Sequence, residues 1–226
     1  MSMSMNTNPN PEFSLEIADN HEPRCLCVVA VDRSSSMGGK PIEALNLGLG
    51  CLRDELRRDR LTSARVEIVL ISFGGDVTVD AAAVSPARFN PPTLEAQGGT
   101  PMGAAILAGL DCVDERLRAY RKHGISPYRP WFFLITDGQP TDDIAPARKR
   151  LLEAEAARKV SVFTVAVDGA DESVLASLSA HRPPARLNGL KFAELFQWLS
   201  VSLRSVSVSR VNDQVALTTT NAWATA

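Results

Sequence analysis

The stretch CLCVVAVDRSSSMGGKP, residues 25–41, changes from apolar to polar in its middle. Its first part is a short apolar run of the kind that forms a strand buried on both faces of a sheet. Asp32 ends this run, and three consecutive hydroxyls follow at residues 34–36. Two glycines and Pro41 then introduce a helical pattern, with proline where helices favour it, at their start. The stretch therefore predicts a strand, a polar loop and a helix of an α/β fold.

Four other segments have the same strand pattern, because they are short and rich in β-branched or aromatic residues. They are residues 66–73, 76–84, 131–136 and 160–167. The second of them alternates polar with apolar residues and follows Gly74 and Gly75 at hairpin distance, so we expect an antiparallel edge strand there. Longer helical patterns separate the others, which is typical of a largely parallel sheet.

Apolar residues recur at helical spacing between these strands. The first helix begins at Pro41, and its apolar stripe consists of Ile42, Leu45, Leu49, Leu52 and Leu56. Its opposite face carries Arg53, Asp54, Arg57 and Arg58, which we interpret as a solvated face rather than a docking patch. Further helices are expected over residues 101–122, 143–159, 171–179 and 190–203.

Together these elements predict an α/β fold with a doubly wound, mostly parallel six-stranded sheet, one antiparallel edge strand and helices on both faces. A chain of 226 residues suits one such domain with tails. We expect a flexible arm over residues 1–22, the domain over 23–206 and a C-terminal tail over 207–226. Within the arm, the alternating residues 13–17 could add an edge strand.

Charge and composition exclude several classes of protein. The net charge of −2 lacks the excess of basic residues that nucleic-acid-binding proteins carry. No apolar run approaches the roughly 20 residues that span a bilayer. The polar N-terminus does not resemble a secretory signal. Cysteines 25, 27, 51 and 112 lie within apolar patterns, which favours reduced core thiols and a cytoplasmic protein. A metal or redox pair of Cys25 and Cys27 is the less favoured alternative.

Oxygen-bearing side chains follow the first strand and the strand at 131–136. The carboxyl ends of parallel strands meet at one edge of a sheet, where ligands bind. Asp32, Ser34, Ser36 and Asp137 should therefore lie together, and Thr100, directly before a helix that starts with proline, should join them. We expect Arg33 and Ser35 to point outward. Such donors suit a hard cation such as Mg²⁺.

Each of these residues has a simpler interpretation when taken alone. Thr100 is a good helix cap before Pro101, and Thr141 or Asp142 would cap the helix expected at 143–159. Asp and Ser are also common in turns. The combination, in this order and on one edge, favours a site.

The pattern Asp32-x-Ser34-x-Ser36, then Thr100 after two glycines, then Asp137-Gly138, resembles the metal-ion-dependent adhesion site (MIDAS) of von Willebrand factor A domains. The resemblance covers about residues 23–206. Most relatives have Asp-Thr/Ser-Ser-Gly-Ser-Met in the first loop, so this sequence departs from them at positions that are not ligands. GGKPIEALN, QGGTPMGAAI, LITDGQPTDD and FQWLSVSLRSVSVS are similar to the bacterial tellurite-resistance (TerY-like) type, and VALTTTNAWA matches its ending loosely.

The resemblance implies a non-enzymatic interaction module. In it the hydroxyls of Ser34, Ser36 and Thr100 ligate Mg²⁺ or Mn²⁺, and Asp32 and Asp137 act directly or through water. The remaining coordination position accepts an acidic side chain of a partner protein. By analogy, a protein kinase and a PP2C-type phosphatase in a stress-response, tellurite-resistance or defence system are candidate partners.

The strongest alternative is a serine hydrolase, because Ser35, Asp137 and His181 occur in the chain order of an α/β-hydrolase triad. The sequence lacks the Gly-x-Ser-x-Gly turn that this mechanism requires. Asp168 ends another predicted strand and is interpreted as a turn residue rather than a residue supporting the site. The Ser-rich segment 200–210 could be phosphorylated by a kinase partner, although a polar helix end is the favoured interpretation.

Overall fold

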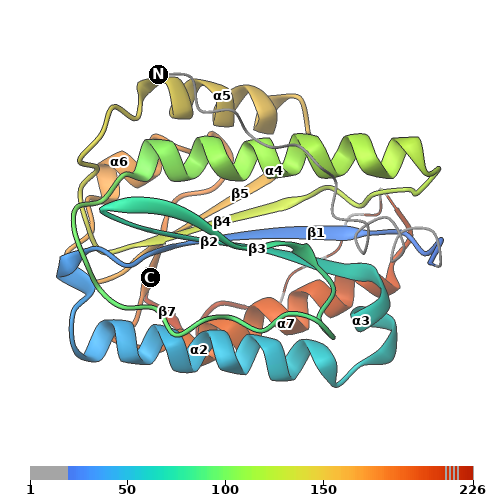
Figure 1. The fold of residues 1–226 in the computed structure, drawn as a ribbon, viewed down its shortest axis with the longest axis horizontal. Coiled ribbons are helices and arrows are strands. Elements are labelled where there is room, and N and C mark those ends of the chain that lie inside the picture. Colours follow the sequence, from blue (N-terminus) through green and yellow to red (C-terminus); the bar gives the residue numbers. More distant parts are fainter. Residues whose placement is uncertain (1–19, 212, 214, 216, 218, 226) are drawn as a thin grey trace.

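A seven-stranded sheet forms the middle layer of the computed structural model, which describes residues 20–211, 213, 215, 217 and 219–225 (Figure 1). The strand order is β3-β2-β1-β4-β5-β6-β7. The strands are β1 Cys25–Asp32, β2 Val66–Gly74, β3 Asp76–Val84, β4 Trp131–Thr136, β5 Ser161–Ala166, β6 Ala185–Leu187 and β7 Ala224–Thr225. The five inner strands are parallel, and β3 and β7 are antiparallel to their neighbours at the two edges.

The predicted fold class is confirmed, and each of the five predicted strands matches an observed strand to within one residue at either end. Strands β6 and β7 have only three and two residues, too few to show a periodic pattern. The sheet consequently has a second antiparallel edge strand that the sequence did not predict. The possible strand at residues 13–17 lies outside the described residues.

Helices cover both faces of the sheet (Figure 1). They are α2 Lys40–Arg57, α3 Arg60–Arg65, α4 Met102–Lys122, α5 Ala145–Ala156, α6 Glu172–Ala176 and α7 Phe192–Val208, with a 3₁₀ turn η1 at Ser35–Met37. Helices α2 and α7 pack against one face, and α4 and α5 against the other. The short helices η1 and α3 were not predicted, because a single turn shows too little periodicity.

Strand β1 contributes to both halves of the core. Cys25, Cys27, Val29 and Val31 belong to the cluster that includes α2 and α7, while the residues between them belong to the cluster that includes α4 and α5. All eight residues of β1 are buried. Burial on both faces explains why the strand is continuously apolar rather than alternating.

Both cysteines of β1 are free thiols. Burial raises the pKa of the Cys25 thiol to about 12, and burial with the neighbouring Cys25 raises that of Cys27 well above its usual value. Such thiols stay protonated, which is the state expected of core residues and not of a redox pair.

The charged face of α2 is solvated as expected, since Asp54, Arg57 and Arg58 are exposed, but Arg57 also makes contacts with another segment. Arg57 donates hydrogen bonds to the carbonyl oxygens of Pro86 at 2.9 Å and Phe89 at 2.9 Å. This arginine therefore holds the segment that follows β3, while Arg53 forms a surface ion pair with Asp54.

Residues 207–226, the predicted C-terminal tail, include the end of α7 and strand β7. Trp223 is 1% exposed, and its ring centroid lies 5.3 Å from that of Trp198 on α7. The Trp223 carbonyl accepts a hydrogen bond from the Asn188 N–H at 2.7 Å. Within the Ser-rich end of α7, Ser202 and Ser207 are buried.

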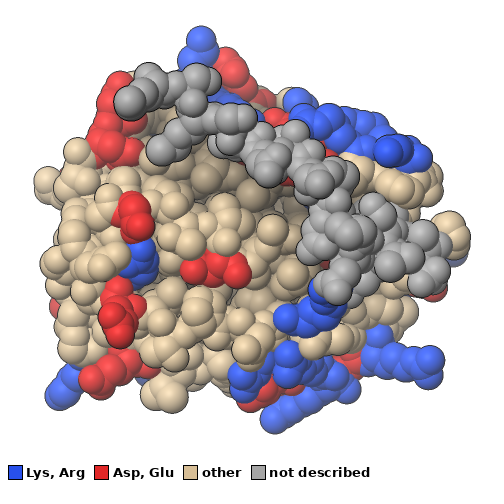
Figure 2. All heavy atoms as spheres, in the orientation of Figure 1, with Lys and Arg blue, Asp and Glu red and all other residues tan. Residues whose placement is uncertain are grey.

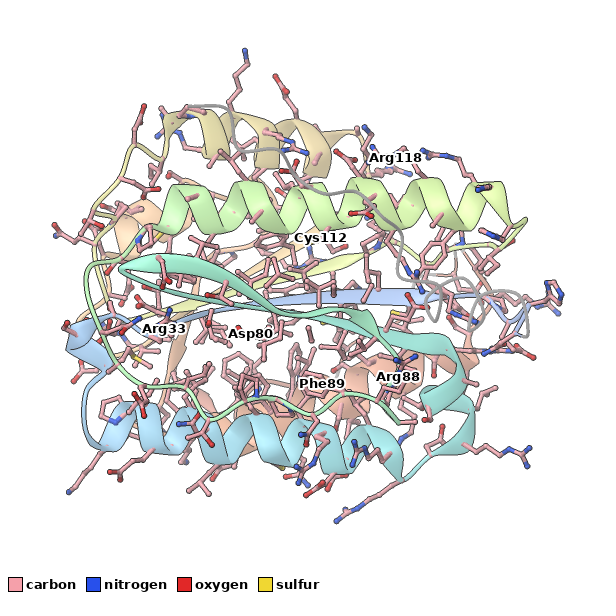
Figure 3. The ribbon with its side chains drawn as sticks, viewed as in Figure 1. Arg33, Asp80, Arg88, Phe89, Cys112 and Arg118 are labelled. Atoms are coloured by element: carbon pink, nitrogen blue, oxygen red, sulfur yellow. The ribbon has the colours of Figure 1, made fainter. Side chains whose placement is uncertain are left out.

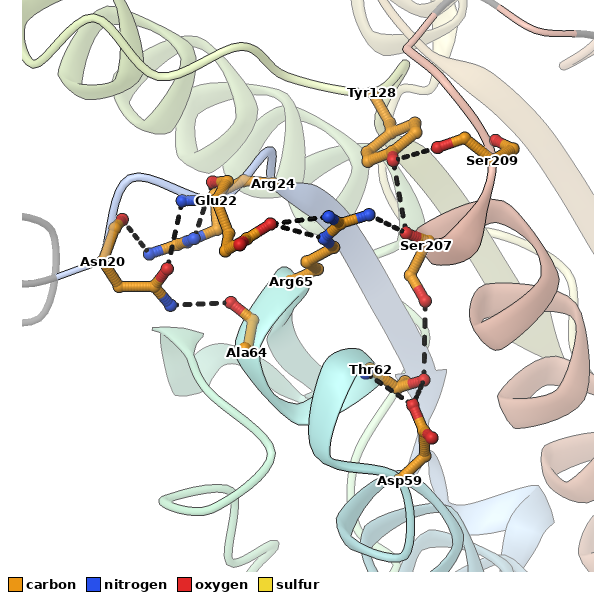
Figure 4. A network of polar contacts seen from close by, with 10 residues as sticks. All are labelled: Asn20, Glu22, Arg24, Asp59, Thr62, Ala64, Arg65, Tyr128, Ser207 and Ser209. Atoms are coloured by element: carbon orange, nitrogen blue, oxygen red, sulfur yellow. Dashed lines mark hydrogen bonds and ion pairs between the residues drawn. The ribbon is translucent and has the colours of Figure 1, made fainter.

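A polar network ties the first described residues to α3 and the end of α7 (Figure 4). Arg65 donates to the Glu22 carboxylate at 2.6 Å and to the Ser207 carbonyl at 2.6 Å. The Tyr128 hydroxyl donates to the carbonyls of Ser207 and Ser209. These contacts lie at the end of the sheet where β1 begins, opposite the end at which Asp32 is located.

Candidate metal centre

Three separate segments converge where β1 and β4 end. The Ser36 hydroxyl donates to Asp137 Oδ1 at 2.7 Å, and Ser34 Oγ lies 3.0 Å from Ser36 Oγ. A Cβ atom placed on Gly138 would lie 3.0 Å from Thr100 Oγ1 and 3.7 Å from Asp32 Oδ2. The predicted residues are thus brought together at this end of the sheet, Ser34, Ser36 and Asp137 through their side-chain contacts and Asp32 and Thr100 beside Gly138.

Asp32 is fully buried and both of its carboxylate oxygens are held. Oδ1 accepts the Ser34 N–H at 2.7 Å, and Oδ2 accepts the Thr136 hydroxyl at 2.5 Å. Burial raises the pKa of Asp32, while these hydrogen bonds act in the opposite direction. The orientation of this carboxylate is therefore fixed by the chain itself.

Thr136 is a residue of this site that sequence reasoning missed. It is completely buried as the last residue of β4, and the Gly138 N–H also donates to its Oγ1 at 3.1 Å. Its position directly before Asp137 could have indicated from the sequence that Thr136 belongs to the site, although threonine is also a common strand residue.

Asp137 is 8% exposed. Burial raises its pKa, and the negative charge of Asp32 raises it further, against the effect of the Ser36 hydrogen bond. In the described part of the chain, no ion pair joins a Lys or Arg side chain to either carboxylate. A cation between them would supply the missing opposite charge.

Thr100 does not cap a helix, contrary to the alternative considered from the sequence. Its N–H donates to Thr141 Oγ1 at 3.0 Å, and its carbonyl accepts the Thr141 N–H at 2.9 Å. The loop after β4 thus fixes the backbone of Thr100 through two hydrogen bonds with Thr141. This leaves Thr100 Oγ1 beside Gly138.

The alternative in which Thr141 or Asp142 caps the helix at 143–159 is not observed either, since the N-cap residue of α5 is Ile144, which makes no side-chain capping hydrogen bond. Asp142 caps α4 instead, accepting the N–H groups of Gly103 at 3.0 Å and Ala104 at 2.8 Å. At the start of α5, the Ala145 N–H donates to Asp143 Oδ1 at 2.9 Å. The reason is tertiary, because the loop after β4 lies over the first turn of α4, which is distant in the sequence.

Arg33 was expected to point outward and does not, since it is only 8% exposed. Its guanidinium forms an ion pair with Asp76 at the start of β3. Ser35 is exposed as expected, and its N–H donates to the Gly98 carbonyl at 3.0 Å. Arg33 is buried because its ion-pair partner, Asp76, lies on the β2–β3 hairpin beside the loop.

The hydrolase triad is not assembled. The Asp137 carboxylate accepts from Ser36 rather than from a histidine, and His181 lies in an exposed loop after α6. Among the described residues, no hydrogen bond joins the His181 side chain to Ser35 or Asp137.

The donor set consists of oxygen atoms, from two carboxylates and three hydroxyls. The described residues contain no cluster of three or more His, Cys, Asp or Glu side chains, so any metal held here depends on the hydroxyls. Oxygen donors fit a hard divalent cation. On the face shown in Figure 2, Asp and Glu predominate toward this end of the sheet and Lys and Arg toward the opposite end.

Comparison with known proteins identifies the family. The model of the von Willebrand factor type A domain matches residues 27–189, which include Asp32, Thr100 and Asp137. The chain therefore belongs to the von Willebrand factor type A family, and the resemblance found in the sequence is confirmed at this level. No curated protein matches the chain.

Solved structures share the fold at low sequence identity. The von Willebrand factor domain of the type V pili tip protein Mfa5 from Porphyromonas gingivalis has a TM-score of 0.60 at 12% identity, over 86% of this chain and 99% of that chain. Proximal thread matrix protein 1 from the mussel byssus has a TM-score of 0.57 at 14% identity, over 82% of this chain and 49% of its own. Another structure of the mussel protein, with a zinc-occupied MIDAS motif, has a TM-score of 0.56. This chain thus spans about half of the mussel protein.

Within the described residues, every helix is too short or too polar to span a bilayer.

Proposed function

We propose that this protein is a divalent-metal-dependent protein–protein interaction module with an open metal site. The observation that carries the proposal is the convergence of side-chain oxygens where β1 and β4 end: the Ser36 hydroxyl donates to Asp137, and Thr100 Oγ1 and Asp32 Oδ2 lie beside Gly138. Domains of this family generally act as interaction modules rather than enzymes. The zinc-occupied MIDAS motif of the mussel protein supports a metal at the corresponding place.

The residues of the proposed site have different tasks. Ser34, Ser36 and Thr100 would ligate the cation through their hydroxyls, and Asp32 and Asp137 directly or through water. The Ser34 N–H and the Thr136 hydroxyl fix the Asp32 carboxylate. A cation held largely by neutral hydroxyls supplies unneutralised positive charge, which favours an acidic side chain of a partner at its open position.

The proposal extends to the ion and the partners. We expect Mg²⁺ or Mn²⁺, because hard divalent cations prefer oxygen ligands. The similarity to the bacterial tellurite-resistance (TerY-like) type supports a cytoplasmic role in stress response or defence. A protein kinase and a PP2C-type phosphatase are the partners that this similarity suggests, and free buried cysteines are compatible with a reducing compartment.

Calorimetric titration of the purified chain with Mg²⁺ and Mn²⁺ tests the metal site. The wild-type chain should show one site, and Asp32→Ala and Thr100→Ala should each abolish it because each removes a ligand. Asp168→Ala is the matched control, since Asp168 is an exposed carboxylate at the same sheet edge and its loss should leave the titration unchanged. Identical titrations of all four chains would refute the site.

A pull-down from native cells, with and without EDTA, tests the interaction. A partner retained in Mg²⁺ and released by EDTA supports metal-dependent binding. The Asp32→Ala chain should lose the same partner without EDTA. Retention of every partner by that variant would contradict the proposed role of the metal.

A further inference from the structure

Arg33 lies between two of the proposed ligands, Asp32 and Ser34, and its side chain is buried beside the β2–β3 hairpin (Figure 3). One guanidinium nitrogen, Nη2, forms an ion pair with Asp76. With its carboxamide oxygen turned to the same guanidinium, Gln97 accepts from Nη1 at 2.5 Å and from Nη2 at 3.2 Å. The Arg33 side chain therefore contacts two segments that are distant from it in sequence.

Backbone hydrogen bonds join the same three segments. The Arg33 N–H donates to the Phe73 carbonyl at 2.8 Å, and the Gln97 N–H donates to the Arg33 carbonyl at 2.8 Å. On either side of these contacts, Ser35 N–H donates to Gly98 and Gly75 N–H donates to Gly99. The loop with Asp32, the β2–β3 hairpin and the loop that leads to Thr100 thus form one connected unit.

The packing within this unit is close. A Cβ atom on Gly74 would lie 2.5 Å from the Arg33 carbonyl oxygen and 2.8 Å from its Cγ. A Cβ atom on Gly98 would lie 2.4 Å from the Gly75 Cα, and both of these glycines have positive φ. The positions of the segments are therefore set by direct contact, with Arg33 packed against Gly74 and the Gly98 backbone packed against Gly75.

We propose that Arg33 is a positioning residue of the metal centre, which fixes the Thr100 loop relative to Asp32 and Ser34 with Asp76 as its counter-ion. The inference rests on the proposed metal-binding function. A positioning role and a purely electrostatic role predict opposite changes in metal affinity when the Arg33 side chain is replaced. By charge alone, removing a nearby cation would tighten metal binding, whereas removing a positioning residue weakens it.

Mn²⁺ titration of Arg33→Met, Arg33→Lys and Asp76→Asn tests the role. We expect Arg33→Met to weaken Mn²⁺ binding about 10- to 100-fold, in the range typical of residues that orient metal ligands. Arg33→Lys keeps the charge but not the forked guanidinium, so a smaller loss is expected, and Asp76→Asn should also weaken binding. Arg150→Met is the matched control, because it removes an arginine paired with Asp111 and Asp114 between α4 and α5.

A second measurement is independent of the metal. In EDTA, the amide hydrogens of Ser35 and Gly75 should exchange faster in Arg33→Met and Arg33→Lys than in wild type, while amides of the inner strand β5 keep their protection. Unchanged or tighter Mn²⁺ binding by a folded Arg33 variant would overturn the inference. If the wild-type chain binds no Mn²⁺, the proposed function fails, and unchanged exchange at Ser35 and Gly75 would then overturn the inference separately.

Discussion

Ser35 and Ser36 are adjacent hydroxyls with different surroundings. The Ser36 hydroxyl donates to Asp137 on the neighbouring segment, whereas Ser35 contacts Gly98 through its backbone N–H. Both lie in the 3₁₀ turn η1, where successive side chains diverge by roughly 120°. Because of this divergence, only one of the two can face the end of β4, so Ser35 is a spacer in the proposed site.

Gly138 gives a prediction at the scale of one residue. Replacing it by Ala places a methyl group 3.0 Å from Thr100 Oγ1, where the proposed cation would be bound. We expect Mn²⁺ affinity to fall about tenfold or more, as for other substitutions beside metal ligands, with little change in thermal unfolding in EDTA. Calorimetry and thermal denaturation measure the two effects. Wild-type affinity in Gly138→Ala would show that the space beside Thr100 is not used.

At the scale of elements, two features place the site. β1 and β4 are parallel neighbours with Val31 paired to Ile135, so Asp32 and the Thr136–Asp137 pair leave the sheet side by side. The long helices hold these strands from both faces. Helix α2 follows the ligand loop directly and packs along α7, where Gly48 lies against two phenylalanines.

Substitutions at two glycines of α2 test this packing. A Cβ atom on Gly48 would lie 2.7 Å from Phe196 Cδ2 and 2.9 Å from Phe192 Cβ, whereas one on Gly50 meets nothing within 4 Å. Gly48→Ala should lower the free energy of unfolding by about 1–3 kcal/mol through overpacking. Gly50→Ala should raise it by about 0.5–1 kcal/mol, because alanine favours the helix. Urea unfolding measures both, and equal effects of the two substitutions would contradict the described α2–α7 contact.

At the scale of the whole molecule, the C-terminal segment completes the domain. β7 pairs with β6 at one edge of the sheet, and Trp223 joins the core cluster that contains Trp198 and Leu187. The opposite edge is β3, whose first residue is the partner of Arg33. The two edge strands of the sheet thus have different roles: β7 lies next to Trp223 in the core, and β3 supports the proposed site through Asp76.

Trp223 provides the prediction at this scale. Trp223→Ala should lower the free energy of unfolding by about 3–5 kcal/mol, the usual loss for a buried aromatic side chain. Asn221→Ala, an exposed position two residues earlier, should have little effect. Guanidinium unfolding followed by circular dichroism measures both. A midpoint unchanged by Trp223→Ala would show that residues 220–225 do not contribute to the stability of the domain.

The sequence by itself determined the fold class, the order of the five longer strands and the five main helices, and the five proposed ligands Asp32, Ser34, Ser36, Thr100 and Asp137. It could do so because burial on both faces requires continuous apolar runs, and because parallel strands deliver their carboxyl ends to one edge. Only the tertiary structure decided the partners: Asp76 for Arg33, Asp142 for the start of α4, Thr136 for Asp32, and Trp198 for Trp223. Such contacts join residues far apart in the chain or on neighbouring elements, and their choice depends on relative positions that no local pattern encodes.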